Sequence, residues 1–231
     1  MDAIKEHLIH ENPIWLVCSA ATQSAGRGTT GRTWVSTTGN VFVTIAMRES
    51  LLPMMSHRMK LWALVGLAQC AALREICPWV PARLKWPNDV LVEGQKLSGS
   101  LIEHHGDHFL IGIGLNVAHC PEVPSEGGRQ PTSLAMHCTQ EDRPCPDAQT
   151  VIHSVVTHLH RSVCGPQPMP EAEILRQYSS EVDWSQQYVT RKEDGSRGRF
   201  IQPRSLDEFG GLVFTDVETG QEGVQHASYF D

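Results

Sequence analysis

The sequence lacks the features that mark several broad classes of protein. It contains no lysine and arginine run beyond pairs such as Arg191-Lys192, and 26 acidic residues against 19 basic ones give a formal net charge of −7, so nucleic acid is not an expected partner. The longest apolar stretch, Leu61 to Leu73, is too short to span a bilayer. The seven cysteines form no C-x-x-C pair, which argues against a disulfide framework and a zinc site. We therefore expect a globular, soluble protein of a reducing compartment with no membrane partner.

The chain divides by composition into two parts. With 231 residues and 40% hydrophobic content, it can bury one full core and a small appended module. Residues 121–146 are rich in proline, glycine and charge and predict a loop. Before this loop the pattern mixes strands, such as 41–47, with one long helix over 53–77. After it, two helices are predicted over 147–163, capped by Asp147, and over 171–180.

Residues from Asp183 onward follow a different pattern. Three short strand-like segments occur at 188–192, 198–206 and 211–217, and Asp194-Gly195 and Gly210-Gly211 are turn signals. Short strands separated by tight turns predict a small β-barrel. The predicted domains are therefore 1–182 and 183–231.

Two turn signals divide residues 85–117. Glu93-Gly94-Gln95 and His105-Gly106-Asp107 each separate segments with strand-like alternation. This pattern predicts a three-stranded antiparallel meander, in which residues far apart in sequence line one cleft.

Residues suited to anion chemistry are concentrated on this predicted meander. Lys85 and Lys96 flank the Asn88-Asp89 pair, and glycines at 99, 112 and 114 would let a ligand approach the backbone. Each feature also has an ordinary structural explanation when taken alone. Lys85 is compatible with a solvated strand position, and Asn-Asp after a proline is a common turn.

A second motif occupies residues 23–34. Three glycines, at 26, 28 and 31, alternate with Arg27 and Arg32, and Trp34 follows. Such a loop offers backbone N–H groups and two guanidinium forks to phosphate oxygens, and the indole can stack on a ring. By itself, the pattern is also typical of a flexible surface loop with solvated arginines.

Together and in this order, the two motifs closely resemble the catalytic domain of the biotin protein ligase family. The family's glycine-arginine loop is matched by Gln23, Gly26, Arg27, Gly28, Gly31, Arg32 and Trp34. Its K-W-P-N-D segment is matched by residues 85–89, its K-x-x-G segment by Lys96 and Gly99, and its G-x-G-x-N segment by Gly112, Gly114 and Asn116. Residues 131–134 resemble its T-S-L segment.

The resemblance implies a fold and a reaction. The fold would be α+β, with a mixed, mainly antiparallel sheet flanked by helices (the class II synthetase-like, biotin–lipoate ligase fold) and a small C-terminal SH3-like β-barrel. The reaction would be ATP-dependent activation of biotin to biotinyl-5′-AMP, followed by transfer to a lysine of a biotin carboxyl carrier domain. Alternatives are a lipoate or octanoate ligase of the same superfamily, and a catalytically weak module that binds biotin or a carrier.

Site residues follow from the resemblance. The catalytic set would be Lys96, Arg27 and Arg32, with Asp89 orienting the nucleotide or its Mg²⁺. Biotin would contact Gln23, Gly26, Arg27, Lys96, Gly112 and Gly114. ATP would contact Arg32, Trp34, Lys85, Asn88, Asp89 and Asn116. No metal site built from protein ligands alone is expected, because Mg²⁺ would enter with ATP, near Asp89.

The sequence departs from the family pattern at two important places. Thr29 and Thr30 replace a basic pair, so we expect weaker retention of the adenylate. A strand ending in a Ser-Thr pair, which would contact biotin, is also missing before the helix that opens at Met1. Either the start codon has been placed too far downstream, which we favour, or the biotin pocket has a gap. We expect a cytoplasmic protein, or a mitochondrial one if a targeting segment precedes Met1. Pairing into a homodimer through the sheets is left open.

Overall fold

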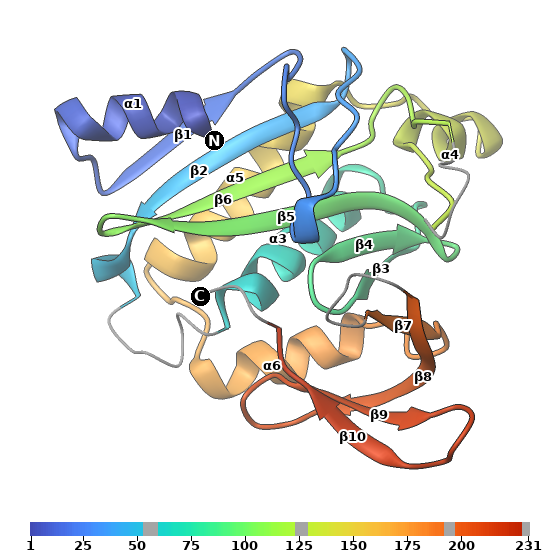
Figure 1. The fold of residues 1–231 in the computed structure, drawn as a ribbon. Helices are drawn as coiled ribbons and strands as arrows, with labels where there is room; N and C mark the ends of the chain where they lie inside the picture. The colour runs from blue at the N-terminus through green and yellow to red at the C-terminus, as the bar shows by residue number, and fades with distance from the viewer. Residues whose placement is uncertain (53–59, 123–128, 192–196, 228–231) are drawn as a thin grey trace.

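A computed structural model describes residues 1–52, 60–122, 129–191 and 197–227 of the chain. Its centre is an antiparallel six-stranded sheet with the order β1-β2-β6-β5-β4-β3 (Figure 1). The strands are β1 (Trp15–Ser19), β2 (Val41–Arg48), β3 (Ala82–Lys85), β4 (Asp89–Val92), β5 (Gln95–His105) and β6 (His108–Leu115). The strand predicted over 41–47 is thus confirmed as β2.

The predicted meander is present but contains one strand more than expected. Both predicted turns exist, with Gly94 at φ 77° and Gly106 at φ 62°, a backbone region that favours glycine. The segment before Gly94 also reverses direction, because Lys85 pairs with Asp89 across a tight turn. Four strands, β3 to β6, therefore replace the predicted three, and β3 is separated from β6 by two strands.

Helices cover both faces of this sheet (Figure 1). They are α1 (Asp2–Glu11), α3 (Leu61–Ile76), α4 (Leu134–Gln140), α5 (Ala148–Cys164) and α6 (Glu171–Glu181). On one face α3, which is apolar on nearly every side, lies between the sheet, α5 and α6. On the other face Ile4 and Leu8 of α1 pack against Ala46 and Leu110. The predicted α+β fold with flanking helices is confirmed.

Three predicted helices are present, and a fourth helix lies in a segment that was predicted to be a loop. The helices predicted over 147–163 and 171–180 correspond to α5 and α6, and the Asp147 carboxylate accepts a hydrogen bond from Thr150 N at 2.7 Å. The long helix is present as α3, while residues 53–59 of that prediction lie outside the described residues. The loop prediction over 121–146 missed α4, whose buried residues recur at helical spacing within a segment too short to show a clear period.

A second antiparallel sheet follows α6. Its order is β10-β9-β8-β7, and its strands are β7 (Tyr188–Arg191), β8 (Arg197–Leu206), β9 (Leu212–Asp216) and β10 (Glu222–Gln225). β10 was not predicted, and the turn predicted at 194–195 lies outside the described residues. Trp86 joins the two sheets, because its backbone N–H donates to the Tyr188 hydroxyl at 2.9 Å and its indole N–H donates to the carbonyl of Gly210 at 3.0 Å. Closure into an SH3-like barrel and a domain boundary at 183 stay predictions.

Two further observations bear on the sequence-based expectations. None of the helices in the described part of the chain is both long and apolar enough to cross a membrane. All seven cysteines are free thiols.

Candidate active site

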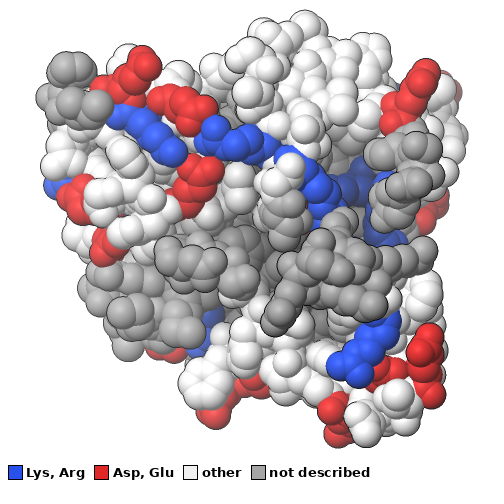
Figure 2. Space-filling model, in the orientation of Figure 1, with Lys and Arg blue, Asp and Glu red and all other residues white. Residues whose placement is uncertain are grey.

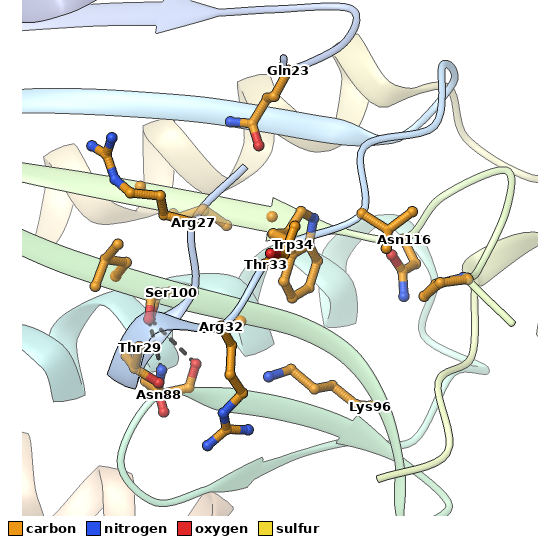
Figure 3. Close-up of a pocket in the computed structure, with 18 of the residues that line it drawn as sticks. Gln23, Arg27, Thr29, Arg32, Thr33, Trp34, Asn88, Lys96, Ser100 and Asn116 are labelled. Atoms are coloured by element: carbon orange, nitrogen blue, oxygen red, sulfur yellow. Dashed lines mark hydrogen bonds between the residues drawn. The ribbon is translucent and has the colours of Figure 1, made fainter. Parts of the chain in front are cut away.

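A cavity of about 260 Å³ opens on the face of the sheet that carries α1. Its floor is formed by β5 and β6, and the loop between β1 and β2 closes over it (Figure 3). The cavity exists because α1 covers only one end of this face, and because β6 carries glycine where its inward positions meet the loop. Figure 2 shows lysine and arginine side chains in a band across the same face that ends in a hollow.

The glycines of β6 let side chains lie directly on the strand. A Cβ at Gly114 would come within 2.5 Å of the Trp34 indole, and one at Gly112 within 2.9 Å of the Met1 side chain. The Trp34 ring therefore rests on backbone rather than on another side chain. Its indole N–H is buried without a hydrogen-bond partner among the described residues, so an acceptor on a ligand would satisfy it.

The glycine-arginine loop is a tight hairpin. Its main chain is closed by hydrogen bonds from Trp34 N to Gly26 O at 2.9 Å and from Gly28 N to Arg32 O at 2.7 Å. At Gly26 a Cβ would come within 2.3 Å of the Trp34 carbonyl oxygen, so the close approach of the two sides of the hairpin requires glycine there. The hairpin directs Arg32 and Trp34 toward β5, where Lys96 extends from the opposite side (Figure 3).

Three charged residues form a cluster at the base of the cavity. The ammonium of Lys96 lies 2.6 Å from Asp89 Oδ1, and that of Lys85 lies 3.7 Å from Asp89 Oδ2. Burial alone would raise the pKa of Asp89, but the two lysines outweigh it and hold that pKa below its usual value. Burial lowers the pKa of Lys85 despite the attraction of Asp89. The Lys96 ammonium also lies 5.5 Å from the Trp34 ring centroid.

Arg27 is already paired with carboxylates at the mouth of the cavity. Its guanidinium donates to both carboxylate oxygens of Asp2, at 2.9 and 3.0 Å, and to Glu103 at 3.3 Å. The hydrogen bond from Arg27 is the main reason why the pKa of Asp2 is lowered. Lys5 joins the same cluster through Glu103, at 2.9 Å. An anion that binds Arg27 therefore competes with Asp2.

The amide side chains are only partly available to a ligand. The Asn88 amide donates to the Ser100 carbonyl at 2.7 Å, and the Asn116 amide donates to the Thr132 carbonyl at 3.0 Å. The Gln23 carbonyl oxygen accepts a hydrogen bond from the Ser36 hydroxyl at 3.0 Å. Asn88 and Asn116 thus shape the cavity through the backbone they hold.

The structure brings most of the predicted site residues together. Those that line the cavity are Gln23, Arg27, Arg32, Trp34, Asn88, Lys96, Gly112, Gly114 and Asn116. Three others stand behind the lining: Gly26 at the base of the hairpin, and Lys85 and Asp89 behind Lys96. The roles assigned to all of these residues stay predictions.

Sequence reasoning missed several residues of the cavity, including Ser100 and Arg129. Arg129 belongs to no motif, and it arrives beside the cavity because residues 130–132 pair with the backbone of Lys96. The only signal in the sequence was its proximity to the Pro131-Thr132-Ser133-Leu134 segment. Within the described ranges, no group of three His, Cys, Asp or Glu side chains could hold a metal ion.

Comparison with known proteins gives consistent matches. Residues 3–116 match the model of the biotin/lipoate A/B protein ligase family. The chain is 37% identical over 114 residues to a biotin–[acetyl-CoA-carboxylase] ligase of Mycobacterium tuberculosis, covering 46% of this chain and 41% of that protein. It is 35% identical over 123 residues to one of Paracoccus denitrificans, covering 50% of each. The matched part thus spans at most half the length of these two relatives.

Solved structures match over nearly the whole chain. A mutant biotin protein ligase from Aquifex aeolicus in complex with biotin has a TM-score of 0.76 at 25% identity, covering 100% of this chain and 94% of that one. The biotin protein ligase from Leishmania major in complex with biotin has a TM-score of 0.73 at 24% identity, covering 98% and 94%. The likeness extends over both sheets, and together with the sequence matches it shows that the chain belongs to the biotin/lipoate A/B protein ligase family.

Proposed function

We propose that this protein is an ATP-dependent biotin protein ligase, which activates biotin as biotinyl-5′-AMP and transfers the biotinyl group to a lysine of a biotin carboxyl carrier domain. The observation that carries the proposal is the position of Lys96 in the cavity, held by Asp89 and facing both the glycines of β6 and the glycine-arginine hairpin. Several of the relatives are named biotin ligases, which supports biotin rather than lipoate as the acid.

The first step joins two anions. A carboxylate oxygen of biotin attacks the α-phosphorus of ATP, the bond from that phosphorus to the bridging oxygen breaks, and pyrophosphate leaves. Two unit charges about 4 Å apart repel by roughly 4 kcal/mol in a surface-like dielectric. Lys96 and Arg32 offset this repulsion, because both line the cavity as fixed cations. Asp89 keeps the Lys96 ammonium in place, so less reorganisation is needed when the ligands bind.

The second step needs little from the protein. The amine of the carrier lysine attacks the carbonyl carbon of the mixed anhydride, the bond from this carbon to the phosphate oxygen breaks, and AMP leaves while the amine loses a proton. The cavity contributes positioning and exclusion of water around the anhydride. Trp34, on the backbone of Gly114, forms one wall of it.

The charges around Asp89 decide whether this cavity could hold Mg²⁺, the metal ion expected to enter with ATP. Asp89, the predicted neighbour of the ion, is already neutralised by two lysines, and a carboxylate in that state is a poor ligand for a hard cation. The described residues around the cavity therefore do not form a fitting site for Mg²⁺. The proposal also includes a biotin carboxyl carrier domain as the partner, self-association into a homodimer, and a cytoplasmic location. The seven free thiols favour this location.

The test is biotin-dependent exchange of pyrophosphate into ATP. We expect exchange with the wild-type protein, and a loss of at least about 100-fold with Lys96→Ala, because one fixed charge at the reacting groups is lost. Arg74→Ala is the matched control, since Arg74 is exposed and pairs with Glu181 far from the cavity. Lipoate in place of biotin tests the alternative ligase. Binding of biotin without exchange in any form would support a binding module and refute the enzyme.

A further inference from the structure

The cations that line the cavity differ in whether carboxylates neutralise them. Lys96 is paired with Asp89, and Arg27 with Asp2 and Glu103. Arg129 also lines the cavity, yet over the described residues it takes part in no ion pair. Its guanidinium donates instead to neutral oxygens, namely the carbonyl of Gly94 at 3.0 Å, the amide oxygen of Gln186 and the carbonyl of Gln187 at 3.5 Å. Arg129 is therefore oriented, and no carboxylate of the described residues forms an ion pair with it.

The position of Arg129 relative to Lys96 is set by main-chain pairing. Lys96 N donates to Gln130 O at 2.7 Å, and Thr132 N donates to Lys96 O at 2.9 Å. Arg129, the residue before Gln130, is thus held beside the first residues of β5, which begins at Gln95. A segment that pairs with the strand of Lys96 cannot shift without moving both cations together.

The guanidinium of Arg129 also has N–H groups that none of its contacts among the described residues uses. Arginine carries five N–H groups, and the three contacts of Arg129 use both N–H groups of Nη1 and one of Nη2. In the described part of the chain, the other N–H of Nη2 and the N–H of Nε have no acceptor. Two adjacent N–H groups of one guanidinium match two oxygens of a phosphate, which is the geometry of a bidentate contact.

We propose that Arg129 binds a phosphate group of the nucleotide in this cavity and helps to retain the adenylate. The inference rests on the proposed function and deepens it, because it names a phosphate-binding residue outside the glycine-arginine hairpin. In that hairpin the neutral Thr29 lines the cavity at a position where the family pattern has a basic residue. Arg129 supplies a charge to the same cavity from another segment of the chain.

The contact with Gln186 connects Arg129 to the segment that precedes the second sheet. Gln186 lies just before β7, and its amide N–H donates to the Asp183 carboxylate at 3.0 Å. Gln186 is thus a positioning residue, because it orients the guanidinium without reaching the phosphate. The connection to the second sheet therefore contributes to nucleotide binding through Arg129.

The experiment compares the wild-type protein with Arg129→Gln, Arg129→Lys and Gln186→Ala. The dissociation constants of ATP with magnesium chloride and of biotin are each measured by titration calorimetry, and biotinyl-AMP released into solution is measured beside pyrophosphate exchange. We expect Arg129→Gln to weaken ATP binding about tenfold or more, to leave biotin binding within twofold, and to release more biotinyl-AMP. Arg129→Lys should recover part of the ATP affinity, and Gln186→Ala should lose less of it.

Three results would overturn the inference. One is unchanged ATP affinity in Arg129→Gln. Another is an equal loss of ATP and biotin affinity in Arg129→Gln and Gln186→Ala together with a lower melting temperature, which indicates a purely structural contact. The third is a wild-type protein that binds no ATP, which also refutes the proposed function. Wild-type exchange with an unaffected Arg129→Gln variant refutes the inference alone.

Discussion

The ammonium of Lys96 lies 2.6 Å from Oδ1 of Asp89, and this pair organises the base of the cavity. Burial raises the pKa of Asp89, and the Coulombic attraction of Lys96 is the largest of the effects that lower it. Lys85 approaches the other carboxylate oxygen at 3.7 Å. One carboxylate therefore separates two cations that would otherwise repel each other, and it holds the lysine of the cavity in place.

Asp89→Asn is expected to destabilise the protein in a pH-dependent way. Against the effect of burial, the two neighbouring lysines hold the pKa of Asp89 below its usual value in the folded protein. A carboxyl group with a lowered folded pKa contributes stability that is present above the unfolded pKa and is lost as the pH falls through the folded one. The difference in unfolding free energy between the wild type and Asp89→Asn should be about 3 to 5 kcal/mol near pH 7, and it should shrink as the pH falls through the unfolded and then the folded pKa of Asp89. Urea unfolding at several pH values measures it.

Asp142→Asn is the control for that series. Asp142 is exposed and has φ 50°, a conformation that asparagine adopts readily. It should change the unfolding free energy by less than about 0.5 kcal/mol at every pH. A loss of stability in Asp89→Asn that stays constant from pH 7 to pH 3 would contradict the assigned ion pair.

Gly114→Ala is expected to displace Trp34. The new Cβ would lie 2.5 Å from the indole, so the ring or the strand must move. Overpacking of this kind costs about 1 to 3 kcal/mol, and biotin should bind at least about tenfold more weakly if the ring forms a wall of its site. The indole N–H resonance of Trp34, identified with Trp34→Phe, should shift. Gly28→Ala, whose Cβ meets nothing closer than 3.5 Å, should leave that resonance in place.

Asp2→Asn is expected to strengthen anion binding at the mouth of the cavity. The substitution removes the charge that competes for Arg27, but both partners are exposed, with 42% and 69% of their side-chain surface accessible, so the effect is small. Biotin should bind about two- to fivefold more tightly at low salt, and the gain should shrink at high ionic strength. Glu6→Gln, an exposed neighbour on α1, should show a smaller gain. Weaker binding by Asp2→Asn would mean that Asp2 positions Arg27 instead of blocking it.

Tyr188→Phe is expected to weaken the junction of the two sheets. The Tyr188 hydroxyl accepts the hydrogen bond from the Trp86 backbone N–H at 2.9 Å in a buried setting, and its removal leaves that donor unsatisfied. A loss of about 1 to 3 kcal/mol in unfolding free energy follows. Val189→Thr, on the exposed side of the same strand, provides the comparison. Equal stabilities of the two variants would show that water replaces the hydroxyl.

The sequence by itself determined several local elements and part of the lining of the cavity. Gly94 and Gly106 mark turns because their backbone conformation favours glycine, and Asp147 caps α5 because its carboxylate reaches a free N–H group at the helix start. The glycine-arginine hairpin and the strands around Lys96 carry motifs, so nine of the residues that line the cavity could be named in advance. Such signals lie within a few neighbouring residues, and local chemistry is enough to interpret them.

Only the tertiary structure decided which charges are free. The pairs of Arg27 with Asp2 and with Glu103 join residues 25 and 76 positions apart, and Arg129 meets Gly94 and Gln186 across 35 and 57 positions. Such contacts depend on how a helix, a hairpin and two sheets pack, and no short pattern records them. α4 escaped prediction for a related reason, because a helix of seven residues is stabilised by the core it packs on more than by its own sequence.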